Sequence, residues 1–411
     1  MITYDYGIIG AGPAGFTAAL LAADNGHSVV LFEKDNIGGT CLNKGCIPTK
    51  TILHSADLYK ELKSSENLGI TAENISFDFA KAMDRKNKVV DTLKNALTKT
   101  LENKGVKIVH AEAEILEKNI ILANSEKYNC NKILIASGSI PRELPNLTFD
   151  HKFILNSDDL FEMTEIPKNI VIVGAGAEGI EWARIFNNIG TNVTIIEAAP
   201  KLLAIADEEI SKYIERMFKV RKINFKTSTT IEKIEEGNIL LSNGENLTAD
   251  AVLVAVGRTV KLPKNCKNLT IIGDASNQIM LANYAMLQAK SEILGIDINK
   301  TLVPSVIYGT PEIAWVGKRE QDLKDDNYKK SVYPLRALGK AHCDNQIEGF
   351  IKILSMDDKI IGAHIISKEA SALIHQILIA MENNTSINNL KEMCFAHPTY
   401  SEGIYESILG L

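Results

Sequence analysis

Two cysteines five positions apart stand in a glycine-rich segment near the N-terminus, Gly38-Gly-Thr-Cys41-Leu-Asn-Lys-Gly45-Cys46-Ile-Pro-Thr-Lys50. In a regular helix, residues at this spacing have Cα atoms about 8 Å apart, whereas a disulfide needs Cα atoms within about 7 Å. A Cys41–Cys46 disulfide therefore requires a distorted segment, and Gly39 and Gly45 provide the backbone freedom for it. Strain makes a disulfide easier to reduce, and a nearby helix start and Lys50 would stabilise a thiolate. The segment predicts a redox-active pair; two unrelated buried thiols would leave the glycines unexplained.

A candidate base lies near the other end of the chain, in His397-Pro-Thr-Tyr-Ser-Glu402. Histidine titrates near neutral pH and can take a proton from a thiol, and a carboxylate five residues later can hold the ring in one tautomer. Pro398 allows a cis peptide bond that would fix the direction of the ring. Taken alone, the pattern is weak evidence, because an isolated histidine is more often a structural residue.

A glycine-rich turn, Gly10-Ala-Gly12-Pro-Ala-Gly15, joins a predicted strand at 4–9 to a predicted helix at 14–25. Glu33 ends the next strand, 18 residues after Gly15. The glycines let backbone N–H groups approach a pyrophosphate at the helix start, and the carboxylate can accept the ribose hydroxyls. This unit predicts a dinucleotide site.

The same arrangement returns in Gly174-Ala-Gly176-Ala-Glu178-Gly179, between a strand at 170–173 and a helix at 179–189. Glu197 follows the strand at 192–196, where its charge would repel a 2′-phosphate, so NAD is favoured over NADP. Glu178 brings a negative charge close to the expected pyrophosphate; an outward-facing carboxylate at the helix start is the alternative. Two such units predict two bound nucleotides.

Composition excludes several classes of protein. The 411 residues are 45% apolar with a formal net charge of −6, which gives no footprint for nucleic acid or an anionic membrane. The apolar stretch 8–23 lacks the basic start of a signal peptide, and no window is long enough to span a bilayer. We expect a soluble, cytoplasmic protein without a metal. The other four cysteines are expected to fill the core: Cys130, Cys266, Cys343 and Cys394.

The remaining patterns complete an α/β fold with two Rossmann-like nucleotide-binding domains and a C-terminal α+β dimerisation domain. A long amphipathic helix is predicted at 77–104 and a small sheet at 106–121. Strands at 304–307, 350–353 and 360–365 and helices at 371–382 and 387–393 predict the last domain. The expected segments are 1–143 (FAD-binding), 144–261 (NAD-binding), 262–300 (return to the FAD-binding domain) and 301–411 (interface).

Taken together, these motifs resemble the pyridine nucleotide–disulfide oxidoreductases, and within them the dihydrolipoamide dehydrogenase branch. The likeness covers nearly the whole chain. Besides the redox segment and His397–Glu402, it is carried by five motifs: Ile133-Leu-Ile-Ala-Ser-Gly-Ser139, Ala255-Val-Gly-Arg258, Gly273-Asp274, Leu281-Ala282 and Pro311-Glu-Ile-Ala-Trp-Val-Gly317. Ile52-Leu-His-Ser-Ala56 and Thr399-Tyr400 look like the lipoamide branch, which also lacks the terminal cysteine pair usual in mercuric reductases.

The resemblance implies a role for each site residue. Cys46 would lie beside the flavin and Cys41 would exchange with substrate, while Lys50 and Glu181 would pair near the reactive edge of the flavin. His397 and Glu402 would act on the disulfide of the other subunit, so a homodimer is implied. The cofactor contacts implied for FAD and NAD are Gly10, Gly12, Gly15, Glu33, Gly39, Thr40, Lys50, Ala113, Ser137, Gly138, Asp274, Leu281, Ala282, Gly174, Gly176, Gly179, Glu197 and Gly257.

The implied activity is oxidation of protein-bound dihydrolipoyl groups by NAD⁺, with the lipoyl domain of a 2-oxo acid dehydrogenase complex or of the glycine cleavage system as partner. A sister reductase of another disulfide, or a flavoprotein subunit with little turnover, remains an alternative. Two features depart from the family. Only 14 residues, 259–272, separate Gly257-Arg258 from Gly273-Asp274. In the second glycine-rich turn, Ala177 replaces a bulkier residue and Glu178 replaces an aliphatic one. Both departures lie in the expected nucleotide-binding regions.

Overall fold

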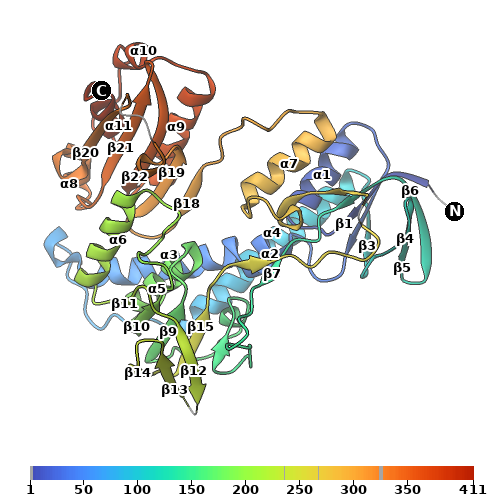
Figure 1. Ribbon diagram of the computed structural model, residues 1–411, viewed down its shortest axis with the longest axis horizontal. Coiled ribbons are helices and arrows are strands. Elements are labelled where there is room, and N and C mark those ends of the chain that lie inside the picture. The colour runs from blue at the N-terminus through green and yellow to red at the C-terminus, as the bar shows by residue number, and fades with distance from the viewer. Residues whose placement is uncertain (1–2, 236, 267, 324–326) are drawn as a thin grey trace.

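Three regions follow one another along the chain in the computed structural model, which describes residues 3–235, 237–266, 268–323 and 327–411 (Figure 1). The N-terminal region, in blue and cyan, lies on the right of the view together with α7. The second region, in green, lies at the bottom, and the orange and red C-terminal region lies at the upper left. The three-region α/β architecture is the predicted one.

The first region is built on a mostly parallel sheet. All five residues of β2 (Val29–Glu33) are buried, as expected for a parallel strand covered on both faces. Its strand order is β3 (Lys107–His110), β2, β1 (Thr3–Ile9), β6 (Glu126–Ile135), β5 (Ile120–Ala123) and β4 (Glu114–Glu117), with β17 (Thr270–Ile271) also on β6. Because β1, β2, β6 and β17 are parallel, their carboxyl ends lie at one edge of the sheet.

Helix α1 packs on β1 and β2, α4 contacts β3, and α7 returns from late in the chain to pack on α1. The Gln288 side chain of α7 accepts a hydrogen bond from Gly273 N at 2.7 Å, which ties α7 to the turn after β17. The helices are α1 (Pro13–Asp24), α2 (Gly39–Lys44), α3 (Cys46–Lys63), α4 (Phe79–Asn103) and α7 (Ala282–Leu294), with short 3₁₀ turns η1 (Ser65–Leu68) and η3 (Gly273–Ser276).

The second region repeats the first in smaller form. Its parallel strands run in the order β11 (Asn224–Lys226), β10 (Asn192–Ile196), β9 (Asn169–Val173), β15 (Ala251–Val254) and β8 (Ile154–Leu155). A separate antiparallel sheet contains β12 (Ile231–Glu235), β13 (Asn238–Leu241) and β14 (Asn246–Thr248). Its helices are α5 (Ala177–Asn188), α6 (Glu208–Val220) and the turn η2 (Asp159–Phe161). A two-stranded ribbon of β7 (Ile140–Pro141) and β16 (Arg258–Thr259) connects the two regions.

The C-terminal region is an antiparallel sheet with helices. Its strands run in the order β18 (Ser305–Ile307), β19 (Glu312–Gly317), β22 (Lys359–Ser367), β21 (Phe350–Met356) and β20 (Lys329–Pro334). Helix α9 packs on β19 and β22, and α11 packs on β20 and β21. The helices are α8 (Gly339–Cys343), α9 (Ala370–Glu382), α10 (Ile387–Lys391) and α11 (Ser401–Leu409), with turns η4 (Glu320–Asp322) and η5 (Leu335–Ala337).

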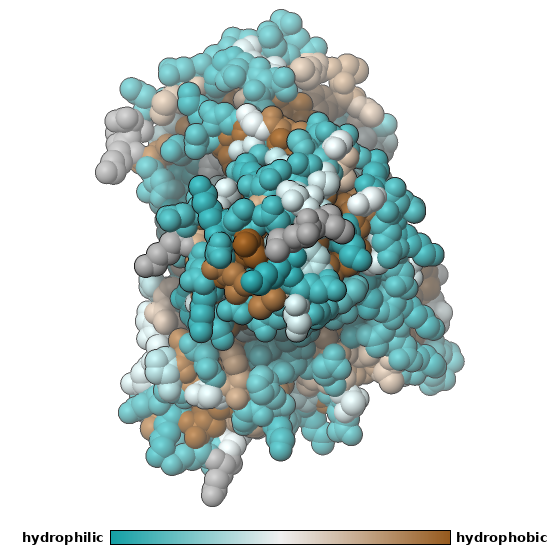
Figure 2. Space-filling model, turned by 90° about the vertical axis from the view of Figure 1, so that its right-hand side faces the viewer, coloured by the Kyte–Doolittle hydropathy of each residue, from teal (hydrophilic) through white to brown (hydrophobic). Residues whose placement is uncertain are grey.

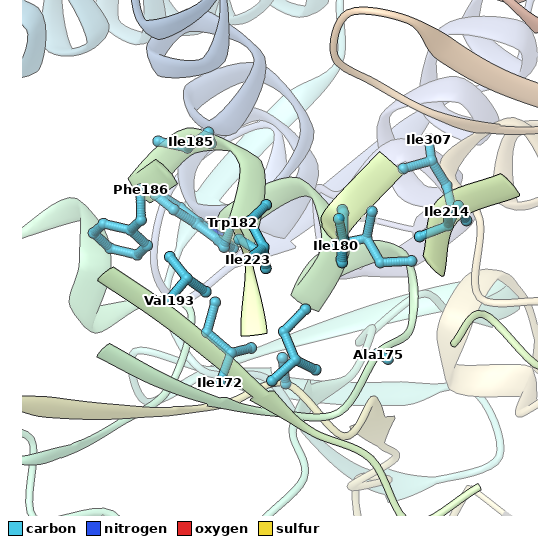
Figure 3. Close-up of a cluster of buried hydrophobic side chains, with 14 of the residues drawn as sticks. Ile172, Ala175, Ile180, Trp182, Ile185, Phe186, Val193, Ile214, Ile223 and Ile307 are labelled. Atoms are coloured by element: carbon cyan, nitrogen blue, oxygen red, sulfur yellow. The ribbon is translucent and has the colours of Figure 1, made fainter. Parts of the chain in front are cut away.

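One hydrophobic cluster extends from the second region into the C-terminal region (Figure 3). Ile172 of β9 and Ile180 of α5 lie in it together with Ile214 of α6 and Ile307 of β18. All four side chains are at most 1% exposed. Because close-packed side chains transmit displacement, α5 and β18 are fixed relative to each other.

A buried ionic cluster joins the same two regions. The Lys352 side chain of β21 is fully buried and lies 2.8 Å from the carboxylate of Asp207, which is also fully buried and caps α6. Glu320 Oε2 lies 2.5 Å from the same ammonium. The carboxylates raise the pKa of Lys352 against the effect of its burial, so the group stays charged.

Some expectations about individual elements were wrong. Cys130 and Cys266 are buried as predicted, but Cys343 and Cys394 are exposed. Cys343 ends the short surface helix α8 and Cys394 lies in the loop after α10, so neither position faces a core. Strands β19 and β20 and helix α11 were not anticipated. The exact domain boundaries remain predictions.

None of the helices within the described residues is both long and apolar enough to cross a membrane. The face drawn in Figure 2 is largely hydrophilic, and its apolar residues form separate patches.

Replacing Lys352 with Met should lower the free energy of unfolding by about 3–5 kcal/mol, because the Asp207 carboxylate would stay buried without its partner. Equilibrium urea unfolding measures the loss. Lys212→Met is the control, since it removes an exposed i,i+4 pair with Glu208 and should leave the unfolding midpoint unchanged. Equal midpoints for both variants would contradict the account.

Candidate active site

The two cysteines of the redox segment lie on either side of a break between helices. Cys41 belongs to α2, Cys46 is the first residue of α3, and Gly45 between them has φ −152° and ψ −110°. Gly39, at the start of α2, has φ +58°, a conformation that L side chains rarely adopt. The segment is therefore distorted at both glycines singled out in the sequence.

Both cysteines are free thiols and partly buried, and their side chains are in hydrogen-bond contact. The hydrogen bond from Cys41 and the charge of Lys50 lower the pKa of Cys46 to about 7, against the effect of burial. The same hydrogen bond and burial raise the pKa of Cys41. The positive end of α3 also favours a negative charge on its first residue. Cys46 is therefore the thiolate of the reduced pair.

Lys50 is held one helical turn after Cys46 by a carboxylate from the second region. Its ammonium lies 2.6 Å from Glu181 Oε2 and 4.9 Å from the ring centroid of Tyr308. Burial alone would lower the pKa of Lys50, but the Glu181 carboxylate raises it. Glu181 is buried in α5 and also accepts a hydrogen bond from Tyr308 N at 2.9 Å. The ion pair predicted from the sequence is formed, with a contribution from Tyr308 that no sequence signal indicated.

The redox segment packs directly on the first glycine-rich turn. Gly38 N donates to Ala11 O at 2.9 Å, and a Cβ on Gly39 would lie 2.6 Å from the Cα of Gly12. A Cβ on Gly15 would lie 1.8 Å from the carbonyl oxygen of Gly10, so this turn admits no side chain. The cysteine pair is thus placed next to the predicted pyrophosphate site.

Two glutamates hold the two glycine-rich turns in the same way. Glu33 accepts hydrogen bonds from Ala11 N at 2.7 Å and Asp35 N at 2.8 Å. Glu197 accepts them from Ala175 N at 2.6 Å and Ala199 N at 2.7 Å. Each carboxylate oxygen keeps a further lone pair that a ribose hydroxyl could use.

The second glycine-rich turn, at 174–179, has the same close approach between two glycines as the first. A Cβ on Gly179 would lie 2.0 Å from the carbonyl oxygen of Gly174, whereas the space beside Gly176 is open. Glu178 is partly buried rather than outward-facing, and burial raises its pKa although Ser157 and Arg258 oppose this. Its carboxyl group is therefore part of the second nucleotide region.

A third carboxylate, Asp274, lies in η3 and accepts a hydrogen bond from the Ser139 hydroxyl at 2.6 Å. Arg258 donates to both the hydroxyl and the carbonyl of Ser139 at 2.7 Å. This brace joins the two ends of the shortened segment 259–272 and was not foreseen, although all three residues lie in motifs that carry the resemblance. The other predicted contacts lie in turns or at helix starts: Thr40 in α2, Ala113 between β3 and β4, Ser137 and Gly138 after β6, Gly257 before β16, and Leu281 and Ala282 at the start of α7.

The residues present fit two dinucleotides. The glycine-rich turns and Glu33 lie at the carboxyl ends of parallel strands, where open α/β sheets bind their ligands. The N-cap residues of α1 and α5 are Gly12 and Gly176, which provide no side-chain cap, so N–H groups of the first helical turn are available to a phosphate. Among the described residues, no group of three or more His, Cys, Asp or Glu side chains is arranged to hold a metal ion.

The predicted base is formed but lies in another part of the molecule. His397 Nδ1 is 2.8 Å from Glu402 Oε1, and Thr399 N donates to Glu402 Oε2 at 2.8 Å. The hydrogen bond from His397 and then that from Thr399 lower the pKa of Glu402, so the carboxylate is ionised and Nδ1 carries the proton. His397 Nε2 is left as a base on an exposed ring, and the His397–Pro398 bond is cis. Figure 1 shows α11, which contains Glu402, far from α2.

Known proteins resemble the chain over its whole length. Residues 4–284 match the family described as pyridine nucleotide-disulphide oxidoreductase, and residues 303–408 match the dimerisation domain of that family. A dihydrolipoyl dehydrogenase of Bacillus subtilis is 34% identical over 98% of this chain and 97% of its own length. A dihydrolipoyl dehydrogenase of Mycoplasma genitalium is 31% identical over 97% and 96%.

Solved structures give the same fold. The structure of LpdA from Mycobacterium tuberculosis superposes with a TM-score of 0.89 at 23% identity, over 98% of this chain and 99% of that one. The HOCl-induced flavoprotein disulfide reductase RclA from Escherichia coli superposes with a TM-score of 0.86 at 25% identity, over 99% of each chain.

Replacing Lys50 with Met should raise the pKa of Cys46 above its value of about 7, because a positive charge that favours the thiolate is lost. The alkylation rate of Cys46 in the reduced protein, followed against pH by peptide mass spectrometry, gives this pKa as its midpoint. Lys44→Met is the control, since Lys44 lies in the same segment but pairs with Asp158. An unchanged midpoint in the Lys50 variant would refute the assigned role of this charge.

Proposed function

The chain belongs to the pyridine nucleotide-disulphide oxidoreductase family, and we propose that it oxidises protein-bound dihydrolipoyl groups to lipoyl groups with NAD⁺ as acceptor. It is an oxidoreductase of a family that uses FAD and NAD. One observation carries the proposal: a cysteine pair whose thiolate lies at a helix start, beside Lys50 and against a dinucleotide turn. Full-length relatives named dihydrolipoyl dehydrogenase support the substrate.

The first steps follow from the cysteine pair and the base. His397 Nε2 takes a proton from one dihydrolipoyl thiol, and the resulting thiolate attacks Cys41 Sγ of the oxidised pair. The Cys41–Cys46 bond breaks, a mixed disulfide forms, and Cys46 leaves as the thiolate. The second substrate sulfur then attacks the first and releases Cys41 as a thiol and the substrate as a cyclic disulfide. Two electrons have passed from the substrate to the cysteine pair.

When the pair loses these two electrons, the Cys41–Cys46 disulfide forms again; FAD and NAD⁺, when bound, would supply the two-electron acceptors for this oxidation. The chain contributes the positions and the proton handling. We assign the FAD to the turn at Gly10, Gly12 and Gly15 with Glu33 and Asp274, and the NAD to the turn at Gly174, Gly176 and Gly179 with Glu197. Lys50, held by Glu181, stabilises the thiolate of Cys46.

In this proposal, His397 acts as the base at the cysteine pair of a second copy of the chain. The match to a dimerisation domain supports a homodimer. The His397 side chain is 77% exposed. Helix α11, which contains its partner Glu402, lies far from α2 within one chain (Figure 1). The dihydrolipoyl group would come from the lipoyl domain of a 2-oxo acid dehydrogenase complex or of the glycine cleavage system. Six cysteines in 411 residues do not make a disulfide scaffold, which suits a cytoplasmic setting.

A second candidate is reduction of another disulfide, which the structural similarity to RclA favours. Assays of the purified protein with dihydrolipoamide, glutathione disulfide and Hg²⁺, each with the appropriate NAD or NADP form, separate the two. Rapid turnover of dihydrolipoamide with NAD⁺ and slow turnover of the others supports the proposal. The reverse order assigns the sister activity, and a flavoprotein that NADH fails to bleach would indicate a subunit without turnover.

Cys41→Ser and Cys46→Ser should each abolish dihydrolipoamide oxidation while some NADH-to-dye activity persists, because the dye does not need the disulfide. Steady-state assays with both acceptors measure the difference. Cys343→Ser is the matched control, since this exposed cysteine lies in α8 and should be replaced without loss. Full dihydrolipoamide activity in either of the first two variants would sink the proposal.

His397→Ala should lower kcat by about 10²–10⁴-fold, as expected when a general base is removed. If the base acts across the dimer, mixing inactive Cys46→Ser with inactive His397→Ala and letting the subunits exchange should restore about a quarter of the activity, since about half of the dimers then contain one intact site. A mixture that stays inactive after verified exchange would place the base in the same chain.

A further inference from the structure

Arg184 is fully buried in α5 and binds the loop that follows β18. Its Nη2 donates to Pro311 O at 2.7 Å and its Nη1 to Tyr308 O at 3.4 Å. Both acceptors are neutral carbonyl oxygens, and Nε has no acceptor among the described residues. Burial lowers the pKa of this guanidinium to about 10, which shows how costly its position is. Such a cation does not contribute the stability that a well-packed apolar side chain would.

The loop fits around Arg184 and admits little change. Gly309 has φ +134°, and a Cβ placed on it would lie 2.2 Å from the Arg184 Cζ atom. Any side chain at position 309 would therefore displace the guanidinium or the loop. Two residues far apart in the sequence form one interlocked contact.

The same turn of α5 holds both polar groups of the Tyr308 peptide. Glu181 accepts a hydrogen bond from Tyr308 N at 2.9 Å, and Arg184 donates to Tyr308 O. Because these residues are three positions apart, they lie on one face of the helix. The other oxygen of Glu181 binds Lys50 at 2.6 Å. The orientation of Glu181 toward Lys50 thus depends on where the loop lies.

A second set of contacts ties the same loop to α3. Asp57 accepts hydrogen bonds from the Thr310 hydroxyl at 3.0 Å and from Asn188 Nδ2 at 2.6 Å, and Arg221 donates to Thr310 O. Asp57 lies in the helix that begins with Cys46, and Asn188 lies on α5 one turn beyond Arg184. The loop is therefore a junction between the redox helix, α5 and the C-terminal sheet.

We propose that Arg184 is a positioning residue for the redox pair: by fixing the Tyr308–Pro311 loop it orients Glu181, and through Glu181 it holds the Lys50 ammonium near Cys46. The inference rests on the role proposed for Cys46 and adds a residue that the family motifs do not include. The ionisable groups that act on Cys46 are Cys41, Lys50 and Glu181, while Lys50 also faces Tyr308. Arg184 acts only through them.

Replacing Arg184 with Met tests this, because Met fills the space without binding the carbonyl oxygens. All proteins carry Cys41→Ser so that Cys46 is the one thiol of the pair, and its alkylation by iodoacetamide is followed against pH by peptide mass spectrometry. The pH midpoint of Cys46 alkylation should rise by about one unit. At a pH below the midpoint, the alkylation rate should therefore fall about tenfold, because the thiolate fraction falls by that factor. A midpoint that stays in place while thermal stability falls would show a structural role only and would overturn the proposal.

Two comparisons make the test specific. Lys86→Met is the matched control, since Lys86 is also a buried cation that donates to a carbonyl oxygen, that of Phe161. It should leave the midpoint unchanged. In a Lys50→Met background, Arg184→Met should add no further shift, because the effect is carried by Lys50. An equal shift in both backgrounds would overturn the proposed route.

If Arg184→Met fails to fold, Gly309→Ala and Arg184→Lys provide the same test. Gly309→Ala displaces the guanidinium and should raise the midpoint, while Arg184→Lys keeps one donor and should raise it less; no shift in either would overturn the proposal. The readout is independent of substrate identity. Failure to oxidise dihydrolipoamide in the parent protein would sink the proposed function and leave this midpoint measurable.

Discussion

The negative charge on Cys46 depends on contacts from three parts of the chain. Cys41 donates a hydrogen bond from α2, the start of α3 provides its positive end, and Lys50 adds a full charge that Glu181 of the second region holds in place. The helix break at Gly45 puts Cys46 at the start of α3, and the packing of α3 on α5 brings Glu181 to Lys50. The fold therefore acts on the chemistry mainly by placing one cation and one helix end next to a sulfur.

The two nucleotide-binding regions hold their glycine-rich turns by the same contacts. In each, a glutamate at the end of the second strand accepts a hydrogen bond from one N–H group of the turn after the first strand, and a glycine lies against the carbonyl oxygen of another glycine. The turn is thus closed to side chains and held by the residue expected to bind the ribose. The shortened segment 259–272 does not undo this arrangement, because the β7–β16 ribbon and the Arg258–Ser139–Asp274 brace span it.

The local features of the fold were readable in the sequence because they have local causes. Both nucleotide units were predicted from the glycine spacing, the strand periodicity and the positions of Glu33 and Glu197. The distorted segment around Gly45 was predicted because Cys41 and Cys46 are five positions apart in the sequence. What could not be read depends on distant contacts. Strand β20 is a partly exposed edge strand with a weak pattern, and Cys394 is exposed because of where its loop lies. Tyr308 and Arg184 matter only because β18 brings the loop against α5, which no spacing along the chain reveals.

An anaerobic titration with dihydrolipoamide tests the central claim most directly. The account predicts that one equivalent per chain yields two new thiols, on Cys41 and Cys46, with a long-wavelength absorption band that fades as the pH falls through about 7 and Cys46 is protonated. A protein that binds no flavin, or one whose two cysteines stay unchanged under excess dihydrolipoamide, would contradict it.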